Sequence, residues 1–332
     1  EGELIFRLAV EMAGCTKPVW RLWISSMEDT AIREGFSHLE PGSRYEPLYH
    51  SALCRSKADW LIGINATRLF SVLYHKTLNV GRVQTPTLAM LAERDGKIML
   101  FQKKKYYHVR LSLNGLEAVS DRVDEKEKAV SMQTACQNGQ AVCVSLEREK
   151  KTVKPPKLYD LTTLQREANR LFGFTAKETL DYAQALYEKK LLTYPRTDSR
   201  YLSHDMLGKV QTTLGSYDGA LQPIGEQALS YGVRMTKRVF DDAKLTDHHA
   251  IIPTGKRADR VNLTADERRL YEMVAKRLAA AFYPNYEYDA LRAVTTCGED
   301  DFLSTGKAVT QEGWKAVYGG DEGKRKKNAD DD

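Results

Sequence analysis

A double proline in the middle of the chain sets the strongest constraint on the fold. Pro155 and Pro156 cannot lie inside a helix, because proline lacks a backbone N–H and clashes with the preceding turn, so the chain passes this point in an extended form. Before it, Tyr107–Leu113 alternates apolar and polar residues, and Ala141–Leu146 is also strand-like. Helical patterns resume at Asp160. The double proline therefore predicts the boundary between a small β region and a helical one.

A second strand-like stretch, Tyr286–Leu303, follows the helical patterns. If it returns to the first β region, the helical block of about residues 155–285 is an insertion within that region. Inside the block, Thr175 and Glu178 have the spacing of a capping box and predict the start of a helix. The expected apolar side of this helix consists of Leu180, Ala183, Leu186 and Leu191.

The N-terminal third predicts the end of an α/β unit followed by a mostly helical region. Glu3–Val10 has a helical pattern, and Arg21–Ser26 reads as a short buried strand before another helix. Ser43–Met99 is helical in pattern and has an apolar stripe. The stripe consists of Leu61, Ile64, Leu69, Leu73, Leu88 and Leu91.

Composition indicates a globular protein of two or three domains, because 42% of the 332 residues are apolar. The net charge of +5 suits a polyanionic partner without requiring one. The five cysteines never form a C-x-x-C pair, which predicts neither a disulfide framework nor a zinc site and favours a reducing cytoplasm. No apolar run approaches the roughly 20 residues that cross a bilayer, so no membrane partner is expected.

The segment Leu191–Ser199 brings a phenol and a permanent cation together. Pro195 disfavours helical geometry at Tyr194, which places the tyrosine at an extended break directly after the capped helix. Arg196, two residues on, would point to the same side. A guanidinium favours phenolate and can bind a phosphate oxygen, so the pair suits attack on a phosphodiester. For Tyr-Pro-Arg alone, a turn with a solvated arginine is the commoner explanation.

The whole of Leu191–Ser199 closely resembles the active-site signature of type IA DNA topoisomerases, in which the tyrosine is the nucleophile and the arginine assists. Three further stretches are similar to the same family in the same order, namely Arg55–Arg68, Asn79–Leu88 and Asp247–Thr254. The residues of the last two stretches resemble those of bacterial topoisomerase III more than those of topoisomerase I.

The second of these stretches looks like the DNA-contacting segment of the family. Gly81 allows close backbone approach, Arg82 can bind a phosphate, and Gln84 can hydrogen bond to a sugar or a base. Without the resemblance, the segment reads as a capped helix start with a surface arginine. The residues expected to contact DNA here are Asn79, Val80, Gly81, Arg82, Val83 and Gln84.

Arg55–Arg68 is similar to the helix that lines the single-strand groove in these enzymes. Arg68 is the expected phosphate contact there, and Trp60 either stacks on a base or fills the core. Arg196 is expected to contact DNA as well as to assist Tyr194.

His248 matches the position that the family uses for phosphate binding or proton transfer. In an extended segment His248 and His249 would face opposite ways, so a shared metal is not expected, and structural hydrogen bonding is the alternative. Glu1–Ile5 looks like the end of the acidic Asp-x-Asp-x-Glu motif of a Toprim domain. The resemblance then implies Mg²⁺ bound by Glu1 and Glu3, with Glu1 as an acid for the leaving oxygen, although the two aspartates of the motif are absent.

The fold implied by the resemblance is multidomain α+β, the toroidal core of a type IA topoisomerase. Its mostly α domains are joined by a β arch, and a C-terminal remnant of an α/β Toprim domain precedes them. The expected division is 1–34 for the Toprim remnant, 35–100 with 313–332 for part of the single-strand DNA groove domain, 101–152 with 287–312 for the β arch, and 153–286 for the helical domain with the active-site tyrosine.

The implied function is transient cleavage of one DNA strand through a 5′-phosphotyrosine at Tyr194, strand passage and religation, which relaxes negative supercoils or decatenates DNA. No ATP is expected, and the sequence has no G-x-x-x-x-G-K-S/T loop for a nucleotide. The expected partner is single-stranded DNA in a bacterial cytoplasm, near the nucleoid. One alternative is a truncated, non-catalytic DNA-binding fragment. Another is a recombinase or relaxase, although relaxases need a His-hydrophobe-His motif that His248-His249 does not supply.

Overall fold

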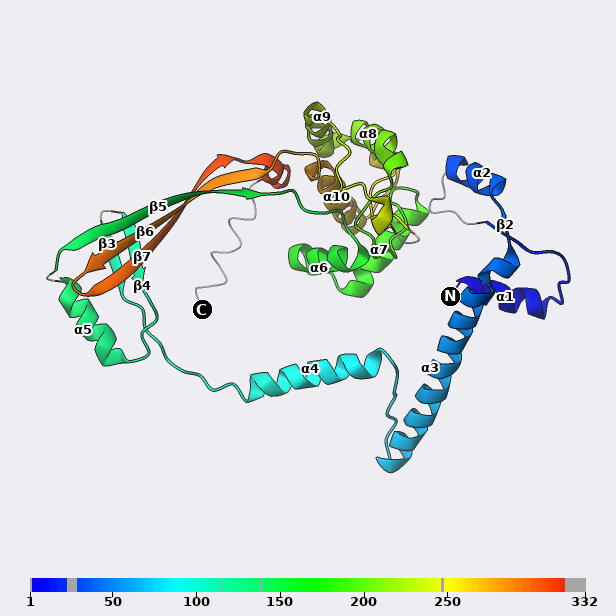
Figure 1. The fold of residues 1–332 in the computed structure, drawn as a ribbon, viewed down its shortest axis with the longest axis horizontal. Coiled ribbons are helices and arrows are strands. Elements are labelled where there is room, and N and C mark those ends of the chain that lie inside the picture. The colour runs from blue at the N-terminus through cyan, green and yellow to red at the C-terminus, as the bar shows by residue number, and fades with distance from the viewer. Residues whose placement is uncertain (1, 23–28, 114, 138, 246–247, 320–332) are drawn as a thin grey trace. The chain divides into compact units, whose positions relative to one another are not determined.

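The computed structural model describes residues 2–22, 29–113, 115–137, 139–245 and 248–319 (Figure 1). The chain divides into two compact units, Glu1–Lys105 and Tyr106–Asp332. The division falls a few residues after the point at which the helical patterns of the N-terminal third give way to strand-like ones. The domain boundaries expected from the resemblance stay predictions.

The first unit is mainly helical, as the sequence predicts. Its strands β1 and β2 pair antiparallel and are two residues long. Of the strand expected at Arg21–Ser26, only Arg21 lies in β1, and residues 23–28 lie outside the described residues. The elements of this unit are α1 (Gly2–Met12), β1 (Trp20–Arg21), α2 (Asp29–Ser37), β2 (Glu40–Pro41), η1 (Gly42–Tyr45), α3 (Glu46–Leu73) and α4 (Gln84–Met99).

Polar contacts hold the N-terminal part of this unit together. The Arg7 guanidinium donates to Glu3, to Glu46 and to the carbonyl oxygen of Gly42, which joins α1 to the start of α3. The apolar stripe of α3 and α4 finds no core among the described residues, because each of its six members is at least 42% exposed. The expectation of helices is therefore confirmed, while the stripe stays on the surface.

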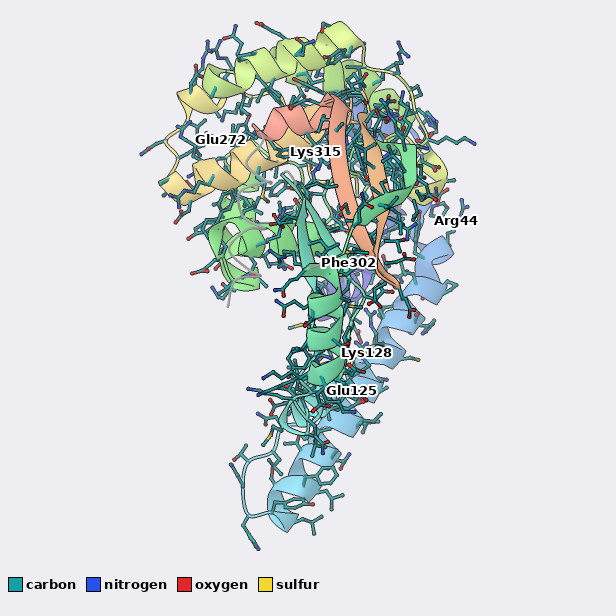
Figure 2. All side chains as sticks on the ribbon, turned by 90° about the vertical axis from the view of Figure 1, so that its left-hand side faces the viewer. Arg44, Glu125, Lys128, Glu272, Phe302 and Lys315 are labelled. Carbon is teal, nitrogen blue, oxygen red and sulfur yellow. The ribbon has the colours of Figure 1, made fainter. Side chains whose placement is uncertain are left out.

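The second unit contains a five-stranded antiparallel sheet with the order β3-β4-β7-β6-β5. Strands β5 and β6 pair from Ala141 opposite Cys297 to Val153 opposite Tyr286, so the late strand-like stretch does return to the first β region. Helix α5 and Phe302 of β7 belong to a small core at one end of the sheet (Figure 2). The elements are β3 (Arg110–Leu113), β4 (Leu116–Ser120), α5 (Lys126–Gln137), β5 (Ala141–Val153), β6 (Tyr286–Cys297) and β7 (Asp300–Gln311).

The helical block is inserted between the end of β5 and the start of β6, where the double proline predicted a boundary. It encloses the largest core of the described residues. The capping box at Thr175 is confirmed, since the Thr175 N–H donates to Glu178 at 2.8 Å and the Glu178 N–H donates to the Thr175 hydroxyl at 3.2 Å. The elements are α6 (Leu161–Phe172), α7 (Ala176–Glu188), η2 (His204–Met206), α8 (Leu207–Gly215), η3 (Gly219–Leu221), α9 (Gln222–Tyr231), η4 (Asp242–Lys244), η5 (Ala258–Arg260) and α10 (Ala265–Ala280).

A short helix, η6 (Gly313–Tyr318), joins the sheet to the helical block. Gly313 has a φ of +47°, and a Cβ atom there would lie 2.1 Å from the Asn285 carbonyl oxygen, so only glycine fits. The Trp314 indole N–H donates to the carbonyl oxygen of Val153 at 3.0 Å. Lys315, labelled in Figure 2, lies 4.4 Å from the centroid of the Tyr286 ring. These contacts fix the ends of β5 and β6 against the block.

A buried cation, Arg277 of α10, ties the extended crossing to the helices. Its guanidinium donates to the Lys157 carbonyl oxygen at 3.1 Å and to the Tyr159 hydroxyl at 2.8 Å, and it forms an ion pair with Glu167. A buried charge is stable only when it is paired and hydrogen bonded in this way. The backbone that follows the double proline is therefore held in one place.

Candidate active site

Tyr194 lies on an extended segment that is anchored in the core. Lys190 adopts a φ of +59° and turns the chain out of α7. Leu192 then pairs antiparallel with Pro253, and the Thr193 N–H donates to the Ile252 carbonyl oxygen at 2.9 Å. The extended break predicted after the capped helix is confirmed. Because Leu191, Leu192 and Ile252 are buried, the backbone beside Tyr194 has little freedom to move.

The Tyr194 ring is half-buried between two other aromatic rings. Its centroid lies 4.5 Å from that of His248 and 5.5 Å from that of Tyr187. The Tyr194 hydroxyl makes no hydrogen bond to any residue that the structure describes. The ring is thus held in position while the hydroxyl oxygen stays available to another molecule.

Arg196 is exposed and makes no hydrogen bond or ion pair within the described part of the chain. Guanidinium groups on protein surfaces commonly pair with a carboxylate, as Arg257 does with Asp259. Arg196 does not contact Tyr194 directly. It is an unpaired cation two residues from the phenol in the chain.

His248 and His249 have different surroundings, although they are adjacent in sequence. His248 packs on Tyr194, whereas His249 is only 7% exposed and its Nδ1 atom has no hydrogen-bond partner in the described ranges. Burial lowers the pKa of His249, and the nearby Lys209 lowers it further, against the opposing effect of Asp205. No group of three or more histidine, cysteine or acidic side chains that could hold a metal ion occurs among the described residues.

The backbone at Ala250 connects the segment that carries Tyr194 to the segment that carries Tyr201. The Ala250 carbonyl oxygen accepts a hydrogen bond from the Thr193 hydroxyl at 2.9 Å, and the Ala250 N–H donates to the Tyr201 carbonyl oxygen at 2.9 Å. The backbone of Ala250 therefore links the segment of Tyr194 to that of Tyr201. The sequence analysis singled out neither Thr193 nor Tyr201.

The candidate DNA-contacting segment Asn79–Gln84 lies in the first unit, where it follows α3 and ends at Gln84, the first residue of α4. The Val80 N–H donates to the Thr67 hydroxyl at 2.9 Å, which ties the segment to α3. Arg82 is exposed but forms an ion pair with Asp59 at 2.8 Å, and this contact raises the pKa of Arg82. Arg82 is therefore partnered in the free protein, and a phosphate would have to compete with that carboxylate. Nothing in the sequence pattern indicated this pair.

Trp60 and Arg68 both lie on α3 and point away from any core. Trp60 is 63% exposed, so the alternative that it fills the core is wrong for the residues that the structure describes. Arg68 is exposed and has no ion-pair partner there. Both side chains are thus exposed on α3, and their contact with DNA stays a prediction.

Two metal ligands were predicted, Glu1 and Glu3. Glu1 lies outside the described residues, and Glu3 is buried. Glu3 is 4% exposed, with one carboxylate oxygen 2.9 Å from Arg7 Nε and the other 2.7 Å from Arg21 Nη2. Each carboxylate oxygen is thus paired with one guanidinium group, and the assignment of Glu3 as a Mg²⁺ ligand stays a prediction. Its role here is to join α1 to β1.

An ion pair stabilises the turn that leads to Tyr194. Lys189 donates to both carboxylate oxygens of Glu267, at 2.7 and 2.8 Å, and the Thr264 N–H also donates to Glu267. Burial raises the pKa of Glu267, but these donors outweigh it and hold that pKa below its ordinary value. A carboxylate with a lowered folded-state pKa contributes stability above its unfolded pKa, and that contribution is lost as pH falls through the folded pKa.

Glu267→Gln is therefore expected to lower the melting temperature at pH 7 by roughly 2–4 °C, for a loss of about 1 kcal/mol. Glutamine keeps the capping box, so only the charge is tested. The difference from the parent chain should shrink as pH falls below about 4, the ordinary pKa of glutamate. Calorimetry across pH measures this, with Glu178→Gln as the matched capping-box control. A difference that does not change with pH would contradict the assignment.

No helix among the described residues is long and apolar enough to cross a membrane.

The comparisons with known proteins agree with one another. The family model of DNA topoisomerases matches residues 43–331. DNA topoisomerase 3 of Bacillus subtilis (strain 168) is 43% identical over 329 residues, which cover 96% of this chain and 45% of that protein. DNA topoisomerase 3 of Bacillus anthracis is 42% identical over 327 residues, with the same coverage.

The fold is also similar to a solved structure. Full-length topoisomerase I from Thermotoga maritima superposes with a TM-score of 0.72 at 25% sequence identity, covering 96% of this chain and 53% of that one. The chain thus spans about half the length of the relatives that it matches.

Proposed function

The chain belongs to the DNA topoisomerase family, and on that basis we propose that it carries the strand-cleaving centre of a type IA enzyme. Tyr194 attacks a backbone phosphate of single-stranded DNA, forms a 5′-phosphotyrosine and later returns the strand. Strand passage between the two steps relaxes negative supercoils or decatenates DNA. The similarity to proteins named DNA topoisomerase 3 supports this reading for a chain that spans 45% of their length.

The observation that carries the proposal is the arrangement of Tyr194, His248 and Arg196. The phenol is positioned by the His248 and Tyr187 rings while its hydroxyl has no partner among the described residues. A nucleophile must be held within reach of the phosphorus atom without being tied up by other groups. An unpaired arginine two residues away supplies the positive charge that the pentavalent transition state requires.

In the proposed cleavage step, the Tyr194 oxygen forms a bond to phosphorus and the bond from phosphorus to the 3′ oxygen breaks. The phenol loses its proton, and the 3′ oxygen gains one. Arg196 binds the non-bridging phosphate oxygens, and His248, which packs on the Tyr194 ring, binds the phosphate or transfers a proton. Attack by the 3′ hydroxyl reverses the step. The phosphotyrosine keeps the energy of the broken bond, so no nucleotide is needed.

Further details follow from the resemblance and are part of the proposal. The two units would belong to a toroidal core, with residues 1–34 as the remnant of a Toprim domain, and Arg68, Trp60 and Asn79–Gln84 would contact the single strand. The protein would act in a bacterial cytoplasm, near the nucleoid. A Mg²⁺ requirement stays a prediction, with Glu1 and Glu3 as the residues that would hold the ion, and no step of the cleavage is assigned to it.

End-labelled oligonucleotides test the polarity of the reaction. The chain is mixed with single-stranded DNA that carries a label on its 3′ end or on its 5′ end, and the mixture is denatured. A 5′-phosphotyrosine keeps the fragment on the 3′ side of the break, so only the 3′ label should migrate with the protein. Transfer of the 5′ label would indicate the opposite polarity, as in a different class of phosphotyrosine enzyme. Binding without any transfer would favour the non-catalytic fragment.

A further inference from the structure

A second tyrosine, Tyr201, has two lysines against it. Lys157 Nζ lies 2.7 Å from the Tyr201 hydroxyl and 5.0 Å from the centroid of its ring. Lys244 Nζ lies 5.1 Å from the same centroid. The hydrogen bond from Lys157 lowers the pKa of Tyr201, burial opposes this, and Lys244 lowers that pKa further.

The positive charge at Tyr201 is only partly neutralised. Lys244 pairs with Asp241 at 3.1 Å, but Lys157 has no carboxylate partner in the ranges that the structure describes. Two ammonium groups and one carboxylate leave a net charge of about +1 beside the phenol. Lys157 is half-buried, and a lysine that loses contact with water is normally paired. Its position is therefore suited to binding an anion.

Both the cluster and the active-site tyrosine are fixed to the same backbone. The Ala250 N–H donates to the carbonyl oxygen of Tyr201, and the Ala250 carbonyl oxygen accepts from the Thr193 hydroxyl. On the other side of the cluster, Arg277 holds the Lys157 carbonyl oxygen at 3.1 Å. An anion bound at Tyr201 would thus keep a constant position relative to Tyr194.

We propose that Lys157, Tyr201 and Lys244 form a binding site for a phosphodiester group of the strand that Tyr194 cleaves. This inference rests on the proposed function and adds a backbone contact to it. A phosphodiester carries one negative charge and several acceptor oxygens, which matches the excess of one charge and the ammonium and hydroxyl donors. The groups do not read base edges, so the contact positions the strand without sequence preference.

The salt dependence of binding tests the site. A fluorescent oligothymidylate is titrated with the full chain at several salt concentrations. Lys157→Gln should weaken binding about tenfold at low salt and reduce the slope of log K against log salt by about 0.7, the value for one phosphate contact on a single strand. Lys177→Gln is the matched control, because Lys177 is exposed and already bound to Asp181 at 2.6 Å. The control should leave the slope unchanged.

A spectroscopic measurement separates direct binding from a structural effect. The phenol carbon of Tyr201 is followed by NMR in protein with labelled tyrosine, and Tyr201→Phe identifies its signal. A bound phosphate disfavours phenolate, so saturation with the oligonucleotide should raise the pKa of Tyr201. If Lys157→Gln does not fold, Lys244→Gln takes its place in the salt titration, with the same expected direction.

The results of these experiments distinguish a failure of the proposed site at Tyr201 from a failure of the proposed cleavage at Tyr194. An unchanged salt slope in a folded Lys157→Gln protein, or a Tyr201 signal that does not respond to saturating oligonucleotide, overturns the site even when the parent chain forms the covalent adduct. A reduced slope and a shifted Tyr201 signal support the site. If they appear in a chain that forms no adduct at Tyr194, the site stands as a DNA contact and the proposed cleavage fails.

Discussion

Tyr194→Phe is expected to abolish the covalent complex between the chain and single-stranded DNA, while binding of the same DNA stays within about twofold of the parent chain. Phenylalanine keeps the ring that packs on His248 and Tyr187 and removes only the hydroxyl oxygen. Because that oxygen makes no hydrogen bond to the described residues, its loss should not disturb the fold. Denaturing gels of labelled strands measure the adduct, and anisotropy measures the binding.

Tyr187→Phe is the matched control for this variant. Tyr187 contributes a ring to the same cluster, with a centroid 5.5 Å from that of Tyr194, and should retain adduct formation. Adduct in the Tyr194→Phe protein at the parental level would contradict the assignment of the nucleophile. Loss of adduct in both variants would indicate that the cluster had been disturbed.

Arg196→Ala is expected to slow adduct formation about 10²- to 10³-fold, the usual cost of removing one group that stabilises charge in a transition state. Arg196 has no partner among the described residues, so the free protein loses no contact and the melting temperature should not change. Arg196→Lys should recover only part of the rate, because an ammonium group cannot donate to two phosphate oxygens in the fork geometry of guanidinium. Single-turnover kinetics at saturating DNA measure all three rates.

Arg257→Ala is the control for the loss of a surface arginine, since Arg257 is exposed and paired with Asp259. Its rate should match that of the parent chain. An Arg196→Ala protein that cleaves at the parental rate but binds DNA more weakly would assign Arg196 to strand binding alone.

Local rules anticipated much of the second unit. The double proline and the alternating residues indicated where the β region ends and where it resumes, and pairing of β5 with β6 confirms that return. The capping box at Thr175 predicted the start of α7. Each of these stretches is recognised from residues near one another in sequence, although β5 and β6 themselves are far apart in the chain. The exposed stripe of α3 and α4 could not be predicted in the same way, because an apolar pattern does not say whether a partner surface covers it.

The candidate site shows the same limit. The motif around Tyr194 predicted an extended break and a neighbouring arginine, but the contact of Tyr194 with His248 joins residues far apart in the chain, and only the fold brings them together. The pairing of Arg82 with Asp59 and that of Glu3 with Arg21 were also invisible in the sequence. A charged residue in a motif does not reveal whether a protein group already neutralises it.

Peptide mapping of the trapped adduct identifies the residue that bonds to DNA. The covalent complex is denatured, the DNA is trimmed with nuclease, and the protein is digested and analysed by mass spectrometry. We expect a nucleotide remnant on the single peptide that contains Tyr194, attached through its phenolic oxygen. A remnant on Tyr201 or any other residue, with Tyr194 unmodified, would contradict it.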